Sequence, residues 1–208
     1  VSLHTTFGEQ TKRVGLHGIR EPLIEAQAAS IGLPLDKIYY PASGDNQVYE
    51  KAMSDYLQIL ERGGVNHLAY GDILLEDLKK YREEKLAEKG FGGIFPLWKK
   101  NTWEVSEEIL NLGFKTIVVC TQEKYGYLVG EVLSRKLIAS FPKEMDVCGE
   151  NGEFHTFAFK GPIFKNPINY SLGKKVFKPL LAPKSVDDNC NESKLENRGF
   201  WYFDLLAD

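Results

Sequence analysis

The chain has few cysteines and no long apolar run. Its three cysteines, Cys120, Cys148 and Cys190, are odd in number and show no CxxC spacing. This pattern argues against a disulfide framework and against a zinc site, and it favours a reducing, cytoplasmic compartment. No apolar stretch approaches the roughly 20 residues that cross a bilayer, and no basic segment followed by an apolar leader is visible. We therefore expect no membrane partner.

An excess of positive charge is also missing. The net charge is −3, the isoelectric point is about 5.9, and the lysines are interspersed with acids. Such a chain has no basic field to attract a polyanion, so nucleic acid is not expected as a partner. Two phosphate-binding loops are absent as well, because neither GxGxxG nor GxxxxGK followed by Ser or Thr occurs in the sequence.

What the sequence does contain is an alternation of helix-like and strand-like segments. With 43% hydrophobic residues among 208, it suits one large domain, or one domain with a small appendage. Pro22 suits the first turn of a helix that ends near Gly32, and Asn101 with Glu104 resembles a capping box. Helical periodicity is expected over residues 19–31, 49–60, 76–88, 101–112 and 127–138. Strands are expected over residues 1–7, 37–40, 65–70, 115–119, 153–159, 175–177 and 200–203.

This rhythm predicts βαβ units, and therefore an α/β fold with an open, mostly parallel sheet and flanking helices. The run 115–119 is continuously apolar, which is typical of the buried middle of a parallel sheet. The tail changes to strands and turns, which indicates a small β-rich subdomain. We expect an α/β domain over residues 1–122, a smaller α+β subdomain over 123–208, and a mobile polar loop at 184–198.

A crowded polar stretch lies between Asp146 and Phe157, where acids, an amide, a thiol and an imidazole surround two glycines. After it, His155 and Phe157 would share one face of a strand. Gly149 and Gly152 would let the backbone bend sharply or approach a ligand. The pattern alone fits a solvated β-turn as well as a binding site.

A second polar segment is expected beyond the carboxyl end of the first strand, where open α/β sheets bind ligands. It runs from Thr6 to His17 and Arg20, and a helix N-terminus there, with a guanidinium and an imidazole, could hold an anion. The alternative is that Arg20 pairs with Glu21 or Glu25 at the surface.

A third segment is Gly71 with Asp72, after the strand expected at 65–70. The glycine would permit a close backbone approach, and the carboxylate could bind a ribose hydroxyl or Mg²⁺. Helix capping by Asp72 is the alternative.

Four motifs together resemble one known family. They are His17-Gly18-Ile19-Arg20 leading into residues 23–28, Gly71-Asp72-Ile73, Phe95-Pro96-Leu97-Trp98, and Cys148-Gly149-Glu150-Asn151-Gly152-Glu153-Phe154-His155-Thr156. On these motifs, over nearly the whole chain, the sequence resembles the diphthine-ammonia ligase family. This family is the ATP-binding branch of the adenine-nucleotide alpha-hydrolase superfamily, also labelled N-type ATP pyrophosphatases, and the resemblance implies that fold. Family members carry a Ser-Gly-Gly-Lys-Asp-Ser phosphate loop upstream of the strand that matches residues 1–7, so we expect that loop before Val1 in a bacterial-type member.

The resemblance implies an ATP-dependent amide-forming ligase that uses Mg²⁺. ATP would adenylate a substrate carboxylate with loss of pyrophosphate, and ammonia would then displace AMP to leave an amide. In the family's named reaction, the carboxylate belongs to diphthine on a translation elongation factor. The implied partners are ATP or AMP, ammonia and that protein acceptor, and a homodimer is compatible with the sequence.

Three groups of site residues are predicted from the motifs together with the resemblance. Contacts to ATP are predicted for Leu3, Thr5, Thr6, His17, Gly18, Arg20, Gly71 and Asp72. Catalytic roles are predicted for Glu150, Asn151, Glu153 and His155. Contacts to the acceptor are predicted for Arg82, Cys148, Gly149, Gly152 and Thr156. Glu150 or Glu153 could bind ammonium or take its proton, while Asn151 and His155 orient the acceptor. Cys148 could be a nucleophile, but it has no assigned base, and a buried structural thiol is favoured.

Other readings stay open. The chain could bind adenine nucleotides without ligase activity, or it could be a ligase for an acceptor other than diphthine. The second reading arises because the helix expected at 76–88 departs from the Tyr-Gln-containing helix of the better-known ligases. A scaffold role for the aromatic run 200–203 is a third reading, although such runs are usually core. The acids and amide clustered at 150–153 favour an enzyme.

Overall fold

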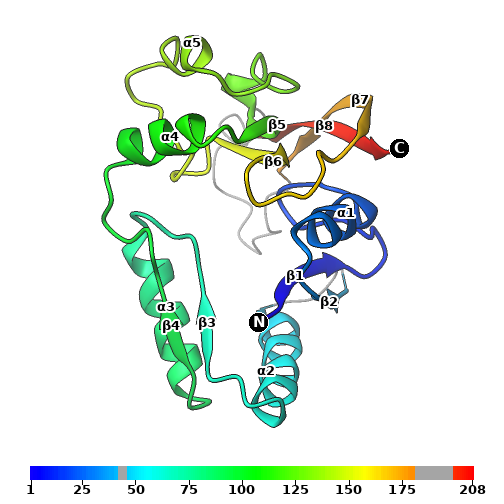
Figure 1. Ribbon diagram of the computed structural model, residues 1–208, viewed down its shortest axis with the longest axis vertical. Coiled ribbons are helices and arrows are strands. Elements are labelled where there is room, and N and C mark those ends of the chain that lie inside the picture. The colour runs from blue at the N-terminus through cyan, green and yellow to red at the C-terminus, as the bar shows by residue number, and fades with distance from the viewer. Residues whose placement is uncertain (42–45, 181–198) are drawn as a thin grey trace, which may run out of the picture.

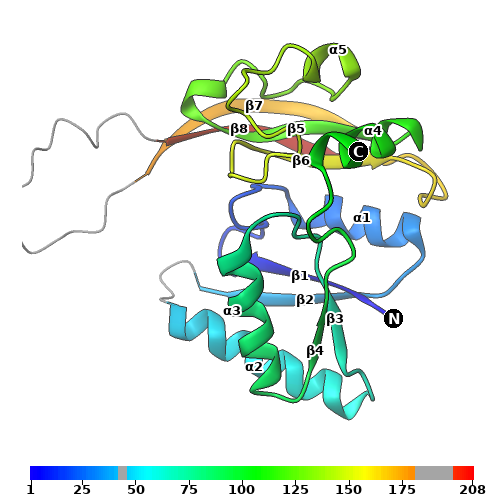
Figure 2. The ribbon, with the colours of Figure 1, turned by 90° about the vertical axis from the view of Figure 1, so that its left-hand side faces the viewer.

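A computed structural model describes residues 1–41, 46–180 and 199–208. Helices and strands both contribute, so the chain is an α/β protein. Figure 1 shows the strands β1 to β4 with the helices α2 and α3 in one region, and the strands β5 to β8 with α4 and α5 in another. The helix α1 lies between the β1–β2 pair and the second region (Figure 2). The loop expected at 184–198 lies outside the described residues.

The first region consists of two short parallel sheets, β1–β2 and β3–β4. Each pair is joined through a helix that connects parallel strands. Its elements are β1 (Leu3–Gly8), α1 (Glu21–Ile31), β2 (Leu35–Tyr40), α2 (Asn46–Arg62), β3 (His67–Ala69), α3 (Glu76–Ala87) and β4 (Gly92–Ile94). A shared apolar core holds these pieces together, because Ile38 of β2, Leu57 of α2 and Leu68 of β3 pack against one another.

The second region is a four-stranded sheet in the order β6-β5-β8-β7, and all its neighbours are antiparallel. Its elements are α4 (Thr102–Asn111), β5 (Lys115–Gln122), the 3₁₀ turn η1 (Glu123–Tyr125), α5 (Arg135–Ile138), β6 (Phe154–Lys160), β7 (Tyr170–Pro179) and β8 (Gly199–Ala207). The strand β5 precedes the boundary expected after residue 122, but it pairs with β6 and β8, which follow that boundary.

The expected open, mostly parallel sheet is therefore shown only in part: the described residues form two short parallel pairs and an antiparallel sheet in the β-rich tail, and the expectation of a parallel sheet around 115–119 is wrong. The strand β5 occupies the inside of a sheet, but that sheet is antiparallel. Its run is continuously apolar because both faces are covered. Ile117 and Val119 pack with Leu23 of α1, whereas Val118 packs with Leu128 on the other face. The apolar run therefore indicates that both faces of the strand are buried. It does not indicate whether the strand is parallel or antiparallel to its neighbours.

The helix expected at 127–138 is also wrong except for its last turn, α5. The segment before α5 runs alongside β5 instead. Gly130 N donates to Val118 O at 2.8 Å, and Leu133 N donates to Thr116 O at 2.9 Å. Gly130 has a φ of 93°, which is outside the helical region. Backbone pairing with β5 outweighs the weak helical periodicity.

Other local predictions are confirmed. The helix α1 contains Pro22 in its first turn and ends at Gly32, which is left-handed with a φ of 85°. The Asn101 side chain accepts hydrogen bonds from Trp103 N at 2.9 Å and Glu104 N at 3.3 Å, and so caps α4. The short strand β4 was not expected, because its glycines carry no β-strand pattern. Within the described ranges, no helix has the length and apolarity that a membrane span requires.

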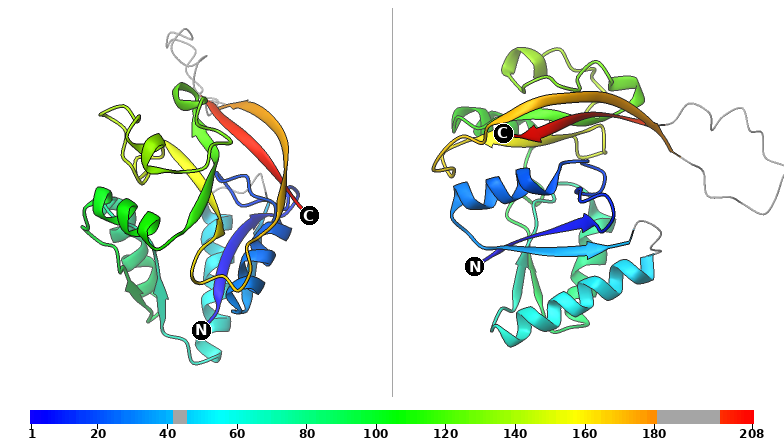
Figure 3. Two further views of the ribbon diagram at one scale, coloured as in Figure 1. Left: turned by 45° about the horizontal axis from the view of Figure 1, so that its top comes forward. Right: turned by 90° about the vertical axis from the view of Figure 1, so that its right-hand side faces the viewer.

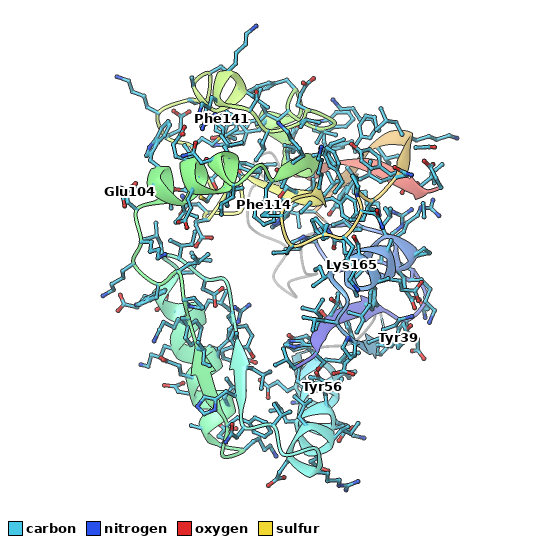
Figure 4. All side chains as sticks on the ribbon, viewed as in Figure 1. Tyr39, Tyr56, Glu104, Phe114, Phe141 and Lys165 are labelled. Carbon is cyan, nitrogen blue, oxygen red and sulfur yellow. The ribbon has the colours of Figure 1, made fainter. Side chains whose placement is uncertain are left out.

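The helix α1 and its neighbouring loop join the two regions. Ile19 and Leu23 share one apolar core with Phe157 of β6 and Leu205 of β8. The β6–β7 connection lies against the end of α1, where Lys165 N donates to the carbonyl of a serine in that helix at 2.8 Å (Figure 4). The views of Figure 3 show the same arrangement, with α1 beneath the antiparallel sheet. This junction brings the N-terminal loops next to the tail.

Candidate functional site

The polar turn before β6 is held together by its own acids. Glu153 is only 3% exposed, and its carboxylate accepts hydrogen bonds from Asp146 N, Asn151 N and Asn151 Nδ2 at 3.0, 3.0 and 3.1 Å. The Asp146 Oδ1 atom accepts from Cys148 N at 2.8 Å and from Glu150 N at 3.3 Å. Glu153 and Asp146 therefore satisfy the backbone of the turn, which is the usual requirement for buried polar groups.

Both glycines of the turn adopt left-handed backbone angles. Gly149 has a φ of 74°, and Gly152 has a φ of 76°. A Cβ atom on Gly149 would lie 2.7 Å from the carbonyl oxygen of Phe154, whereas one on Gly152 would meet open space. The turn therefore needs glycine at 149 for a close backbone contact as well as for its conformation.

Glu150 connects this turn to the end of β3. Its Oε2 atom accepts hydrogen bonds from Ile73 N and Leu74 N, each at 3.1 Å. These residues directly follow Gly71 and Asp72, so two segments predicted as parts of one site lie in contact although they are 77 residues apart along the chain. The other oxygen, Oε1, has no hydrogen-bond partner among the described residues.

Asp72 is occupied by a neighbouring guanidinium. Its carboxylate forms an ion pair with Arg82 of α3, and that guanidinium lies 4.4 Å from the centre of the Tyr70 ring. The capping alternative for Asp72 is wrong, because Leu75 is the residue that precedes α3 and no side chain caps that helix. Gly71 is exposed, and a Cβ atom there would meet nothing within 4 Å. The backbone at Gly71 is thus open to approach.

His17 and His155 come from different segments and stack on each other. Their ring centres are 4.3 Å apart, with an angle of 18° between the planes. Burial lowers the pKa of His17, and burial, together with the proximity of the second titratable ring, lowers the pKa of His155 to about 4. Both rings are therefore neutral at neutral pH, and His17 supplies hydrogen-bonding nitrogens to this site but no positive charge.

Arg20 faces the C-terminal strand. It donates to Asp204 of β8 through Nε at 2.9 Å and Nη2 at 2.6 Å, and Arg13 donates to the same carboxylate at 2.8 Å. The hydrogen bonds from Arg20 and Arg13 hold the pKa of Asp204 well below its usual range. The alternative, a surface pair of Arg20 with Glu21 or Glu25, is wrong, since both glutamates pair with a lysine of β2.

Gly18, which lies between His17 and Arg20, brings the loop that joins β1 to α1 close to the antiparallel sheet. Gly18 has a φ of 69°, and a Cβ atom there would lie 2.8 Å from the Tyr202 ring. Tyr202 lies on β8, two residues before Asp204. The loop that contains His17, Gly18 and Arg20 is thus fixed on the antiparallel sheet.

Several remaining predicted residues lie inside strands. Leu3, Thr5 and Thr6 belong to β1 and pair with residues of β2, so the two threonines lie within the strand and not beyond its end. Thr156 belongs to β6 and pairs with β5. Cys148 donates its thiol to the carbonyl of Thr102 at 3.3 Å, and burial raises its pKa to about 12. The Cys148 thiol therefore stays protonated at neutral pH, as expected of a structural cysteine.

Sequence reasoning missed the contributions of Tyr70, Asp204 and the amides of Ile73 and Leu74. Asp204 had a visible signal, because it is a charged residue inside an apolar strand pattern. The two backbone amides had none, since their role depends on where the tail folds. In the described ranges, no group of three His, Cys, Asp or Glu residues could hold a metal ion.

Comparison with known proteins identifies relatives. Residues 101–180, which span α4, β5, the polar turn and β6, match the family described as the diphthamide synthase C-terminal domain. The chain is also 22% identical over 178 residues to the diphthine–ammonia ligase of Rattus norvegicus. The resemblance to the diphthine-ammonia ligase family is confirmed. The alignment covers 80% of this chain and 64% of the rat ligase, so the chain spans slightly less than two thirds of that relative's length.

Proposed function

We propose that the chain acts as an ATP-dependent ligase that converts a carboxylate into an amide with ammonia, as the name of its relative suggests. One observation carries the proposal, which is the bridge from Glu150 to the amides of Ile73 and Leu74. It places the polar turn of the tail at the carboxyl end of β3, the kind of edge where α/β proteins bind ligands. The open backbone at Gly71 would allow a ligand to approach it closely.

The reaction needs a leaving group on the carboxylate, which ATP supplies as AMP with release of pyrophosphate. The chain would supply positioning. The neutral rings of His17 and His155 offer hydrogen bonds beside the loop that joins β1 to α1. The predicted domains fit this reaction, because residues 1–122 would bind ATP and residues 123–208 carry the polar turn. The strand β5, however, pairs with the strands of the second part. The adenine-nucleotide alpha-hydrolase arrangement and the role of Mg²⁺ remain parts of the proposal.

Glu150 is the better of the two acids for handling ammonia. Glu153 is buried, and three N–H groups occupy its carboxylate. Among the residues that the structure describes, one oxygen of Glu150 has no partner. That oxygen could accept a hydrogen bond from ammonium and take its proton, so that the free nitrogen attacks the activated carbonyl carbon as the bond to AMP breaks. Asn151 is exposed at the same turn and could orient the acceptor.

A second function has a specific observation in its favour. Asp146, Glu150 and Glu153 all accept backbone hydrogen bonds, so the polar cluster can be explained as a device that shapes the turn. A protein that binds adenine nucleotides without ligase activity would need nothing more. A ligase that uses an acceptor other than diphthine also fits the structure. In each case we propose a cytoplasmic protein with no nucleic-acid partner, and a homodimer is compatible with it.

The deciding experiment uses the complete natural protein. ATP binding is measured by calorimetry, and pyrophosphate release and amide formation are measured with ammonium and a diphthine-bearing elongation factor. Glu150→Gln should lower the turnover rate by about 100-fold or more, the usual size of a lost proton-transfer group, and should leave ATP affinity nearly unchanged. Glu144→Gln, at an exposed position of the same loop, is the matched control and should behave as wild type.

The outcomes separate the candidates. Failure of the wild-type protein to bind any adenine nucleotide would refute the ligase and the nucleotide-binding readings together. ATP binding without pyrophosphate release would favour the binding protein. Full turnover in Glu150→Gln would remove the role that we assign to this carboxylate.

A further inference from the structure

A groove of about 460 Å³ lies between α2 and α3, away from the residues predicted from the sequence apart from Arg82. Its apolar lining comes from both helices and includes Met53, Leu57, Leu78 and Leu86. A groove of this volume is within the range that holds small organic ligands, and such sites usually combine an apolar lining with a few polar groups.

Aromatic side chains also contribute to the lining of the groove. Tyr49 of α2, Tyr70 after β3 and Tyr81 of α3 all line it. The Tyr70 ring is fixed by Phe95, whose ring centre is 5.5 Å away with an angle of 21° between the planes. Burial raises the pKa of Tyr70, so its hydroxyl remains a hydrogen-bond donor at neutral pH. The exposed rings of Tyr49 and Tyr81 offer a flat surface for an apolar or aromatic ligand, whereas Phe95 and the Arg82 guanidinium already cover Tyr70.

The charges around the groove are unequally compensated. Lys85 lies 3.3 Å from Glu50 and 3.7 Å from Glu88, so this cluster of one positive and two negative charges carries a net charge of −1. By contrast, Lys51 of α2 and Lys89 after α3 line the groove, and neither has an acidic partner in the part of the chain that the structure describes. With Arg82 paired to Asp72, the lining keeps a net charge of +1, and its unpaired positive charges come from both walls, which favours an anionic ligand.

One end of the groove reaches the candidate site. Tyr70 and Arg82 line the groove, and Arg82 also pairs with Asp72. The residues after Asp72 are those that bind Glu150. A ligand in the groove would therefore lie next to the contact between β3 and the polar turn.

We propose that the groove between α2 and α3 is a binding site for small organic acids that carry an apolar or aromatic body. The apolar lining and tyrosines take the body, and Lys51 and Lys89 attract the acid. Binding of such an acid does not depend on the proposed ligase activity.

The test uses two probes of the same shape and opposite charge, 4-phenylbutyrate and 4-phenylbutylamine. Each is titrated into the ¹⁵N-labelled chain, and amide shifts are followed by NMR. The acid should shift amides of α2, α3 and Tyr70, and should bind more tightly than the amine. The double variant Lys51→Gln with Lys89→Gln should weaken binding of the acid by about fivefold, as expected for two exposed charge contacts, and should not weaken binding of the amine.

Two further variants complete the design. Lys80→Gln is the matched control, because this exposed lysine is on α3 but does not line the groove; it should leave the affinity for the acid unchanged. Ser54→Phe places a ring in the groove and should abolish binding of both probes. Equal affinity for the two probes, acid shifts outside the groove, or unchanged binding in the lysine double variant would each overturn the proposal.

Calorimetry with ATP keeps the two proposals apart. Retention of ATP binding by Ser54→Phe, together with loss of the acid, would show that the groove and the nucleotide site are separate. A wild-type protein that binds the acid but no ATP would refute the proposed ligase and leave the groove site intact. A wild-type protein that binds ATP but not the acid would refute the groove site and leave the proposed ligase intact.

Discussion

The imidazole of His155 is kept neutral by its surroundings. Burial and the nearby His17 lower its pKa from 6.5 to about 4. Cys120 of β5 pairs with His155, the loop of His17 also contains Arg13 and Arg20, and these two arginines already bind Asp204. Glu153, two residues before His155, is engaged by the backbone and side chain of its own turn. Among the described residues no carboxylate is thus seen to pair with either imidazole, so the stacked rings gain little from protonation. The histidine pair should therefore make the fold sensitive to acid.

The expected pH dependence of stability follows from the direction in which folding shifts the pKa of His155. In the unfolded chain His155 takes up a proton near pH 6.5, but in the folded chain it does so only near pH 4. Between these values the unfolded state binds more protons, so the free energy of unfolding should fall as pH falls, by on the order of 2 kcal/mol. Urea denaturation across this range measures the effect. His155→Phe keeps a stacking ring without the titrating group and should flatten the profile.

An NMR titration of His155 can contradict the predicted acid sensitivity. If NMR titration of the folded chain gave His155 a pKa at or above 6.5, burial would not control this ring. The acid sensitivity would then have to come from other groups. The same experiment reports on His17, whose pKa is also lowered by burial.

At the scale of elements, the segment beside β5 depends on one glycine. Gly130 has a φ of 93°, and a Cβ atom there would lie 3.1 Å from the Phe203 ring. Gly130→Ala should destabilise the chain by about 2–4 kcal/mol, from left-handed backbone strain and from crowding against that ring. The free energy of unfolding in urea measures the loss.

Gly113→Ala is the matched control for that substitution. Gly113 follows α4 and has a φ of 82°, but a Cβ atom there would meet nothing within 4 Å. It should show the backbone strain alone, and so cost about 1 kcal/mol less than the change at Gly130. Equal losses at the two positions would mean that Phe203 does not constrain the segment.

Sequence patterns predicted most elements but not the direction of the strands. The helices α1, α2, α3 and α4 appear where periodicity, Pro22 and the Asn101 cap placed them. These signals depend on nearest neighbours along the chain, so they can be read locally. The antiparallel pairing of β5 depends on β6 and β8, which come later in the chain, and no local signal distinguishes it from parallel pairing.

At the scale of the whole molecule, Asp204 joins the N-terminal loop to the tail. Arg13 and Arg20 both bind its carboxylate, which is 19% exposed. Asp204→Asn would leave two guanidinium groups without their anion, and should lower the free energy of unfolding by about 1–3 kcal/mol because the cluster is only partly buried. Since its pKa is depressed, this contribution should be present at neutral pH and lost only in strong acid.

The matched control removes an exposed ion pair. Glu107→Gln breaks the pair with Arg135, in which both side chains are about half exposed at 49% and 57%. It should change the free energy of unfolding by no more than about 0.5 kcal/mol. If Asp204→Asn were equally mild, the loop would be held on the sheet by the Gly18 contact and the apolar core.

The sequence by itself determined which residues are chemically notable and which short segments form helices and strands. Residue types and local spacing carry that information, so the polar turn at 146–153 and the loop with His17 and Arg20 could be singled out. The tertiary structure decided how those groups are used. It directs Glu153 inward to the turn, Glu150 to the end of β3, and Arg20 to Asp204. The partners of Glu150 and Arg20 are fixed by the packing of distant segments, which the local sequence does not encode.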